Sequence, residues 1–183
     1  LLLDIETSPN VVDAWGLFDQ NIGINQIHEA SRVICFAAKW LGDPDTMFWS
    51  EVQDRAEMIG AAHDLLNDAD VVIHYNGKRF DIPHLNREFL LAGYTPPSPY
   101  QQIDLLAVAK RQFKFISNKL AYVSVALGLP GKVSHEGHAL WTKCLAGDME
   151  AWGRMEEYNR HDVELLEPLY LRLLPWITNH PNR

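Results

Sequence analysis

The sequence predicts an α/β domain in which helices flank a mixed sheet, and three observations support this fold class. Apolar runs near the front of the chain are typical of buried strands. Helical periodicity separates the later strand candidates and then dominates the last third of the chain. The length of 183 residues suits one domain with a sizeable core, so we expect a single domain over residues 1–183.

Five segments have the composition of strands. The first, residues 1–6, is apolar except for Asp4 and Glu6, as expected for a strand covered on both faces. The other four expected strands are 32–40, 46–50, 71–75 and 101–103. Gly42 to Asp45 supplies the turn between the second and the third.

Apolar spacing and capping residues predict six helices. They cover about 58–69, 82–92, 104–113, 117–127, 138–146 and 148–176. Asp104, Ser117 and Asp148 are the expected N-caps of the third, fourth and sixth. A glycine-rich loop over 128–137 separates the fourth helix from the fifth.

Composition limits the classes of function. The formal net charge of −8 argues against broad binding along a duplex, but not against an enzyme that grips a short nucleic-acid end. No apolar run approaches the roughly 20 residues that span a bilayer, so no membrane association is expected. Cys35 and Cys144 form no Cys-x-x-Cys pair, which favours free, partly buried thiols in a reducing cytoplasm.

Asp4 and Glu6 are the first candidate site residues. Side chains two apart on a strand point the same way, so an apolar strand directs two carboxylates to one side. Buried charge is costly unless it is paired or bound to a metal. The alternative is a strand end at which both acids reach solvent, and this pair alone does not separate the two interpretations.

Tyr158 and Asp162 lie four residues apart and therefore on one face of the expected last helix. That face is an apolar stripe with no Lys or Arg in it: Met155, Tyr158, Asp162, Leu166, Leu169 and Leu173. A carboxylate in such a row needs a partner. The stripe therefore indicates a functional role for Asp162.

Asp81 follows the strand 71–75 and opens a helix, where Asp is also a common N-cap. A capping carboxylate can still direct an oxygen to a metal, so acids from three distant segments could converge. Four carboxylates close together cannot all stay ionised without counter-charge, and hard divalent cations such as Mg²⁺ or Mn²⁺ are the natural solution. Two such ions about 3.5–4 Å apart can clamp both oxygens of an in-line phosphoryl displacement.

The order of these motifs resembles the DnaQ-like exonuclease superfamily in its tyrosine (DEDDy) branch. The motifs are Asp4-Ile5-Glu6-Thr7, Asn76 to Asp81, and Tyr158 to Asp162. The histidine branch has His five residues before the last Asp, where this chain has Glu157. The chain is similar to stand-alone bacterial or phage exonucleases related to the proofreading domains of family B polymerases.

The resemblance implies an RNase H-like fold, in which the second strand of a five-stranded mixed sheet is antiparallel. The implied ligands of two Mg²⁺ or Mn²⁺ ions are Asp4, Glu6, Asp81 and Asp162. Tyr158 would place the attacking water, and Thr7, Asn76 and Phe80 would lie near the terminal nucleotide. The expected activity is 3′→5′ hydrolysis of a DNA end, single-stranded by preference, that releases 5′-mononucleotides.

Other functions fit the same residues. An exoribonuclease is one, because contacts to the 2′-OH of RNA cannot be located from sequence, although DNA is favoured. The other is a nuclease-like module that binds nucleic acid without cutting it, which the loss of a motif acid would favour; none is lost here. A polymerase or helicase partner is left open.

Basic residues gather late in the chain, beside Phe113 and Phe115. They are Lys110, Arg111, Lys114 and Lys119. One interpretation is a phosphate-binding patch with rings that stack on bases. The favoured alternative is a solvated helix face, because such charge runs are common on surfaces.

Overall fold

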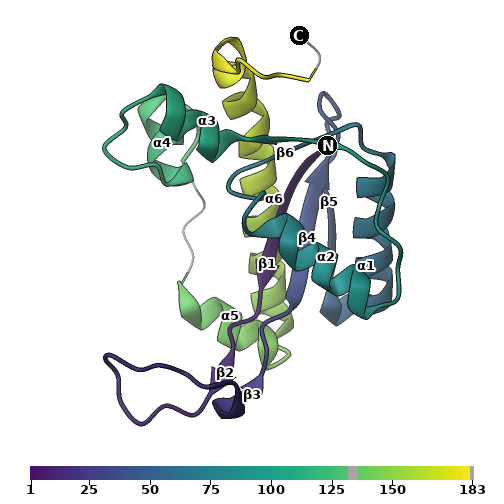
Figure 1. Cartoon of the computed structure of the whole chain (residues 1–183), viewed down its shortest axis with the longest axis vertical. Helices are drawn as coiled ribbons and strands as arrows, with labels where there is room; N and C mark the ends of the chain where they lie inside the picture. Colours follow the sequence, from purple (N-terminus) through teal and green to yellow (C-terminus); the bar gives the residue numbers. More distant parts are fainter. Residues whose placement is uncertain (132–135, 182–183) are drawn as a thin grey trace.

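The computed structural model describes residues 1–131 and 136–181, so part of the expected loop 128–137 lies outside the described residues. Five strands form the main sheet: β1 (Leu2–Thr7), β4 (Val33–Lys39), β5 (Met47–Ser50), β6 (Val71–His74) and β7 (Gln101–Asp104). Their spatial order is β5-β4-β1-β6-β7 (Figure 1). β4 runs antiparallel to β1 and β5, whereas β1, β6 and β7 are parallel. The predicted mixed sheet, with its second strand antiparallel, is confirmed.

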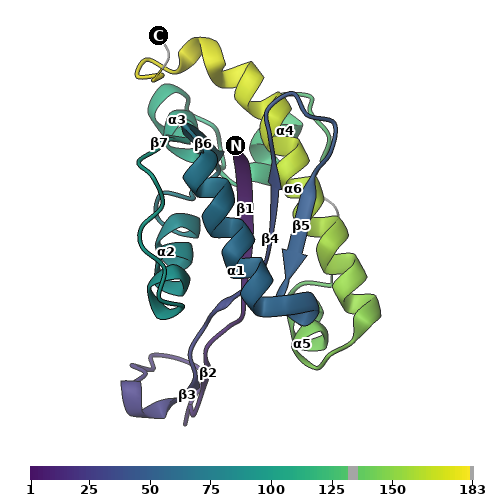
Figure 2. The ribbon, with the colours of Figure 1, turned by 90° about the vertical axis from the view of Figure 1, so that its right-hand side faces the viewer.

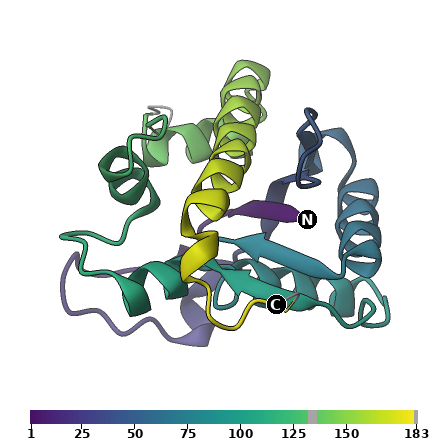
Figure 3. The same cartoon turned by 90° about the horizontal axis from the view of Figure 1, so that it is seen from above.

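Helices cover both faces of the sheet (Figures 2 and 3). α1 (Glu51–Asp68) and α2 (Asp81–Leu91) pack on one face. The other face carries α3 (Leu105–Gln112), α4 (Leu120–Ala126), α5 (His138–Leu145) and the long α6 (Met149–Leu173). The six helices expected from the sequence are therefore present, with the two layers separated by the strands.

Side-chain alternation along β1 decides which face receives its acids. Leu1, Leu3 and Ile5 pack with α1 and α2, whereas Leu2 packs with the core under α6. Because alternate side chains point to opposite faces, Asp4 and Glu6 share the face of Leu2. The strand therefore directs both carboxylates toward α6.

Two of the three expected N-caps are confirmed. The Asp104 carboxylate accepts hydrogen bonds from the N–H groups of the first turn of α3, and Asp148 does the same for α6. The expected cap at Ser117 is wrong, because α4 begins at Leu120 and the Ser117 hydroxyl accepts only from the Lys119 N–H, at 3.3 Å. A short 3-10 helix, η2 (Leu174–Trp176), follows α6.

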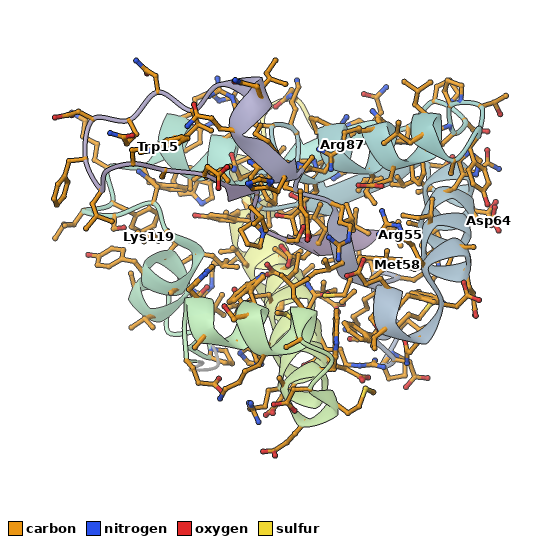
Figure 4. The ribbon with its side chains drawn as sticks, turned by 90° about the horizontal axis from the view of Figure 1, so that it is seen from below. Trp15, Arg55, Met58, Asp64, Arg87 and Lys119 are labelled. Atoms are coloured by element: carbon orange, nitrogen blue, oxygen red, sulfur yellow. The ribbon has the colours of Figure 1, made fainter. Side chains whose placement is uncertain are left out.

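A projecting arm, residues 8–31, joins β1 to β4 and was not predicted. It contains the short helix η1 (Ile24–Gln26) and a two-stranded sheet of β2 (Val11–Val12) and β3 (Ile27–Glu29), below the main body in Figures 1 and 2. Its base is closed by hydrogen bonds between Ser8 and Arg32. Trp15, which Figure 4 labels on this arm, is 82% exposed. The arm therefore buries little apolar surface.

The buried carboxylate of Glu88 joins the two helices on the first face. It accepts from Arg55 of α1 at 2.7 Å and from Arg87 of α2 at 3.0 Å, and it also accepts from the Val33 N–H. Figure 4 shows both arginines where α1 and α2 meet. Arg55 and Arg87 are therefore paired with a carboxylate within the fold.

Cys35 and Cys144 are free and buried, as expected. No helix within residues 1–131 and 136–181 is both long enough and apolar enough to cross a membrane.

Candidate active site

β1 and β4 hold the first two acids of the site. In the antiparallel register Asp4 lies opposite Ala37 and Glu6 opposite Cys35, and both acids are half-buried. Burial and then the charges of Glu6 and Asp4 raise the pKa of the Cys35 thiol. The thiol is therefore protonated at neutral pH and serves as an apolar neighbour of the site.

α6 brings Tyr158 and Asp162 to the same face, both buried as the apolar stripe predicts. Asn159, fully buried between them, donates from Nδ2 to Asp4 Oδ2 at 2.8 Å and to the Asp4 carbonyl oxygen at 3.3 Å. These bonds fix the helix to the strand. Asn159 was missed, although the argument applied to Asp162, a polar residue turned inward, would have found it.

The Tyr158 hydroxyl is close enough to three acids for their charges to act on it. Burial raises the pKa of this phenol, and the charges of Glu6, Asp162 and Asp4 raise it further, as does its hydrogen bond to Asp162. The hydroxyl therefore stays protonated at neutral pH and donates to Asp162. The Trp141 ring of α5 packs edge-on against the Tyr158 ring, with centroids 6.1 Å apart.

Asp81 approaches β1 from the start of α2. Its Oδ1 accepts from the Ile5 N–H at 3.0 Å, on the backbone between Asp4 and Glu6. Burial raises the pKa of Asp81 to about 7, against the lowering effect of the Ile5 N–H, and the charge of Asp104 adds to the increase. The structure therefore brings all four predicted acids to one strand, with Asp81 beside its backbone and the others on the α6 face.

The loop between β6 and Asp81 is held by Asp104. Asn76 has a positive φ of 73°, and its N–H donates to Asp104 Oδ1 at 2.9 Å. The Gly77 N–H donates to Nδ1 of the buried His74, and a Cβ at Gly77 would lie 2.4 Å from that ring, so only glycine fits. Asp104 was predicted as a cap alone, and its second role of positioning this loop was missed.

The three predicted substrate contacts lie around the acids. Thr7 ends β1, where the register with β4 shifts. Asn76 begins the loop, and Phe80 ends it with a ring that is 38% exposed and contacts His84. Their roles toward a nucleotide stay predictions.

The side chains of the four acids are of the chemical type that binds hard divalent cations. All four offer carboxylate oxygens, the ligands that Mg²⁺ and Mn²⁺ prefer. Burial raises the pKa of Asp81, and a divalent cation beside it would favour the ionised form. Across the described ranges 1–131 and 136–181, no three His, Cys, Asp or Glu side chains are arranged to hold an ion as they stand, so the acids would have to move closer around one.

Comparison with known proteins supports this reading of the fold. The family model of the RNase H superfamily matches residues 25–174, a range that begins after β1 and includes Asp81, Tyr158 and Asp162. Sequence comparison with curated proteins finds no match. A similar solved structure is the family B DNA polymerase from the hyperthermophilic archaeon Pyrobaculum calidifontis, with a TM-score of 0.70 and 18% identity. The similarity covers 95% of this chain and 24% of the polymerase, so the chain spans about a quarter of that protein. With a matched range that covers most of its length, this chain belongs to the RNase H superfamily.

Proposed function

We propose that the chain is a metal-dependent 3′→5′ exonuclease of the tyrosine (DEDDy) branch, which releases 5′-mononucleotides from a DNA end. The observation that carries the proposal is the contact between α6 and β1, where Asn159, beside Tyr158, donates to the Asp4 carboxylate at 2.8 Å. Asp81 adds another carboxylate at the same strand. Membership of the RNase H superfamily and a fold similar to that of a DNA polymerase support a nuclease.

The four carboxylates would hold two Mg²⁺ or Mn²⁺ ions. When bound, these ions would lower the pKa of a coordinated water and stabilise charge on the leaving 3′ oxygen. Asn159 keeps the Asp4 carboxylate in place through its 2.8 Å hydrogen bond. The chain thus supplies acidic side chains for the end of a strand, and these would move closer around the bound ions.

Tyr158 acts on the water rather than on the metals. Its raised pKa rules out a phenolate base at neutral pH. Because the O–H donates to Asp162, the phenol oxygen keeps lone pairs that can accept a hydrogen bond from the attacking water. Tyr158 therefore orients that water for attack on the last phosphodiester.

A single assay tests the function. DNA and RNA oligonucleotides, single- and double-stranded and labelled at either end, are incubated with Mg²⁺, Mn²⁺ or chelator. We expect stepwise release of mononucleotides from 3′ ends, fastest on single-stranded DNA, and no release with chelator. Release from 5′ ends, internal cuts, or metal-independent cleavage would contradict the mechanism, and faster loss of RNA would identify an exoribonuclease.

Tyr158→Phe tests the orienting role. The variant keeps the buried ring and loses the hydroxyl, so we expect kcat to fall by roughly 10–100-fold, the range of one positioned hydrogen bond. The affinity for Mn²⁺, measured by calorimetry, should change by less than about threefold, since the carboxylates remain. Loss of Mn²⁺ binding in this variant would show that the hydroxyl supports the metals instead.

A further inference from the structure

The cationic side chains of the described residues fall into two groups. Those with a carboxylate within 4.0 Å are Arg32, Lys39, Arg55, Arg87, Lys143, Arg154 and Arg160. In residues 1–131 and 136–181, those without one are Lys78, Arg79, Lys110, Arg111, Lys114, Lys119 and Arg172. In a chain with a net charge of −8, a cluster from the second group marks a place for an anion.

Four cations of the second group surround two adjoining surface pockets beside the β6–α2 loop. One pocket, of about 230 Å³, is lined by Asn76, Lys78, Arg79 and Lys110 among others. The other, of about 160 Å³, is lined by Lys78 and Arg111, with Lys78 contributing to both. At roughly 30 Å³ for each water, either pocket has room for a phosphate group and part of its hydration.

Asp104 also lines both pockets and offsets one of their four positive charges. Its Oδ1 accepts from the N–H groups of Asn76, Leu106 and Ala107, so this oxygen is directed at the backbone. On the opposite side, Arg111 is held by Thr178 Oγ1 at 2.6 Å, in the C-terminal segment that lies beside α3 (Figure 3). The pockets are therefore built by fixed elements, and Lys78, Arg79 and Lys110 remain exposed at their rims.

The pockets lie near Asp81, because Lys78, which lines both of them, is close to this acid in the sequence. Lys78 precedes Asp81 by three residues, and consecutive Cα atoms are 3.8 Å apart, so these two Cα atoms lie within about 11 Å of each other. Asp81 in turn contacts β1 at Ile5. A strand whose last phosphodiester lies at the acids can therefore place its next phosphates at the pockets. The arm, residues 8–31, contains no Lys or Arg that could make such a contact.

We propose that Lys78, Arg79 and Lys110 bind backbone phosphates of the nucleic-acid strand upstream of its terminal nucleotide. The inference rests on the proposed function for its substrate, but it concerns binding and not cleavage. It also separates Lys110 and Arg111 from the other basic residues of their segment, because these two line pockets together with Lys78 of the β6–α2 loop. Lys114 and Lys119 line neither pocket.

Two matched variants test the phosphate site. The first variant combines Lys78→Gln with Lys110→Gln. The second, which is the control, combines Lys114→Gln with Lys119→Gln. Each variant removes two exposed positive charges. Binding of a fluorescein-labelled single-stranded DNA of about 12 nucleotides is measured by anisotropy across a salt series, with chelator to prevent cleavage. For the first pair we expect affinity to fall about tenfold, and the slope of log K against log[salt] to shrink by about 1.4, or about 0.7 for each lost phosphate contact. The second pair should bind within about twofold of the wild type.

The outcomes separate the two proposals. Equal losses in both pairs, or no loss in the first, would overturn the phosphate site, and a wild type that still cuts DNA would leave the exonuclease standing. A wild type that cuts no substrate would refute the exonuclease, and the phosphate site would still stand if affinity fell only in the first pair. Circular dichroism and thermal unfolding confirm that each variant is folded.

Discussion

Asp162→Asn is expected to reduce hydrolysis by about 10³-fold or more while the protein stays folded. The amide keeps the size of the side chain and can still accept the hydrogen bond of Tyr158, so the packing of α6 against β1 should persist. It lacks the negative charge with which a carboxylate attracts a divalent cation. A loss of 10³ corresponds to about 4 kcal/mol of transition-state stabilisation, a reasonable share for one ligand of a two-metal site.

Glu157→Gln is the matched control for this variant. Glu157 lies on the same helix, one residue before Tyr158, but its side chain is exposed. The substitution removes the same charge, so it should retain the wild-type rate of mononucleotide release. If Asp162→Asn kept more than a tenth of that rate, or if both variants lost activity alike, Asp162 would have no special role and the assignment of the site would fail.

The acids could be located from sequence because each departs from its local pattern. Asp4 and Glu6 interrupt an apolar strand, and Asp162 interrupts an apolar helical stripe. Periodicity fixes the face on which such residues lie, and the burial of Asp162 in the structure agrees with it. Asp81 was harder to interpret, because an Asp at the start of a helix has a common explanation as a cap. In the structure Phe80 occupies the N-cap of α2, and the Asp81 carboxylate is bonded to β1 instead.

Contacts between distant segments could not be read from the same patterns. The bond from Asn159 to Asp4 and the bond from the Asn76 N–H to Asp104 each join residues that are far apart in sequence. The β2–β3 arm was missed because its strands are two and three residues long, too short for an alternation signal.

The basic residues show the same limit. Phe113 and Phe115 are partly buried at the edge of the core, where Phe113 contacts both Phe115 and Trp176. Lys110 shares a pocket with Lys78 and Arg79, which lie about thirty residues earlier in the chain. Proximity in sequence could not group Lys110 with Lys78 and Arg79, since α2 and β7 lie between these segments in the chain.

Asp81→Asn should make the protein more stable at pH 8 while it removes activity. The pKa of Asp81 is about 7 in the folded chain and 3.8 as a free side chain, so between these values the folded state binds more protons than the unfolded state. Stability contributed by this group therefore falls as pH rises from about 4 to about 7, and is constant above. The amide has no charge to desolvate and can still accept from the Ile5 N–H, so the variant avoids this loss.

Urea unfolding at pH 5 and pH 8 measures the effect. We expect the difference in free energy of unfolding between variant and wild type to grow by roughly 1–3 kcal/mol from the lower pH to the higher. At pH 8, Mg²⁺ should stabilise the wild type more than the variant, because a cation offsets the charge of Asp81 only where that charge exists. A difference that does not change with pH would mean that Asp81 is ionised without cost in the folded protein. The acid would then have its counter-charge within the chain, and the physical reason for a cation at this end of α2 would disappear.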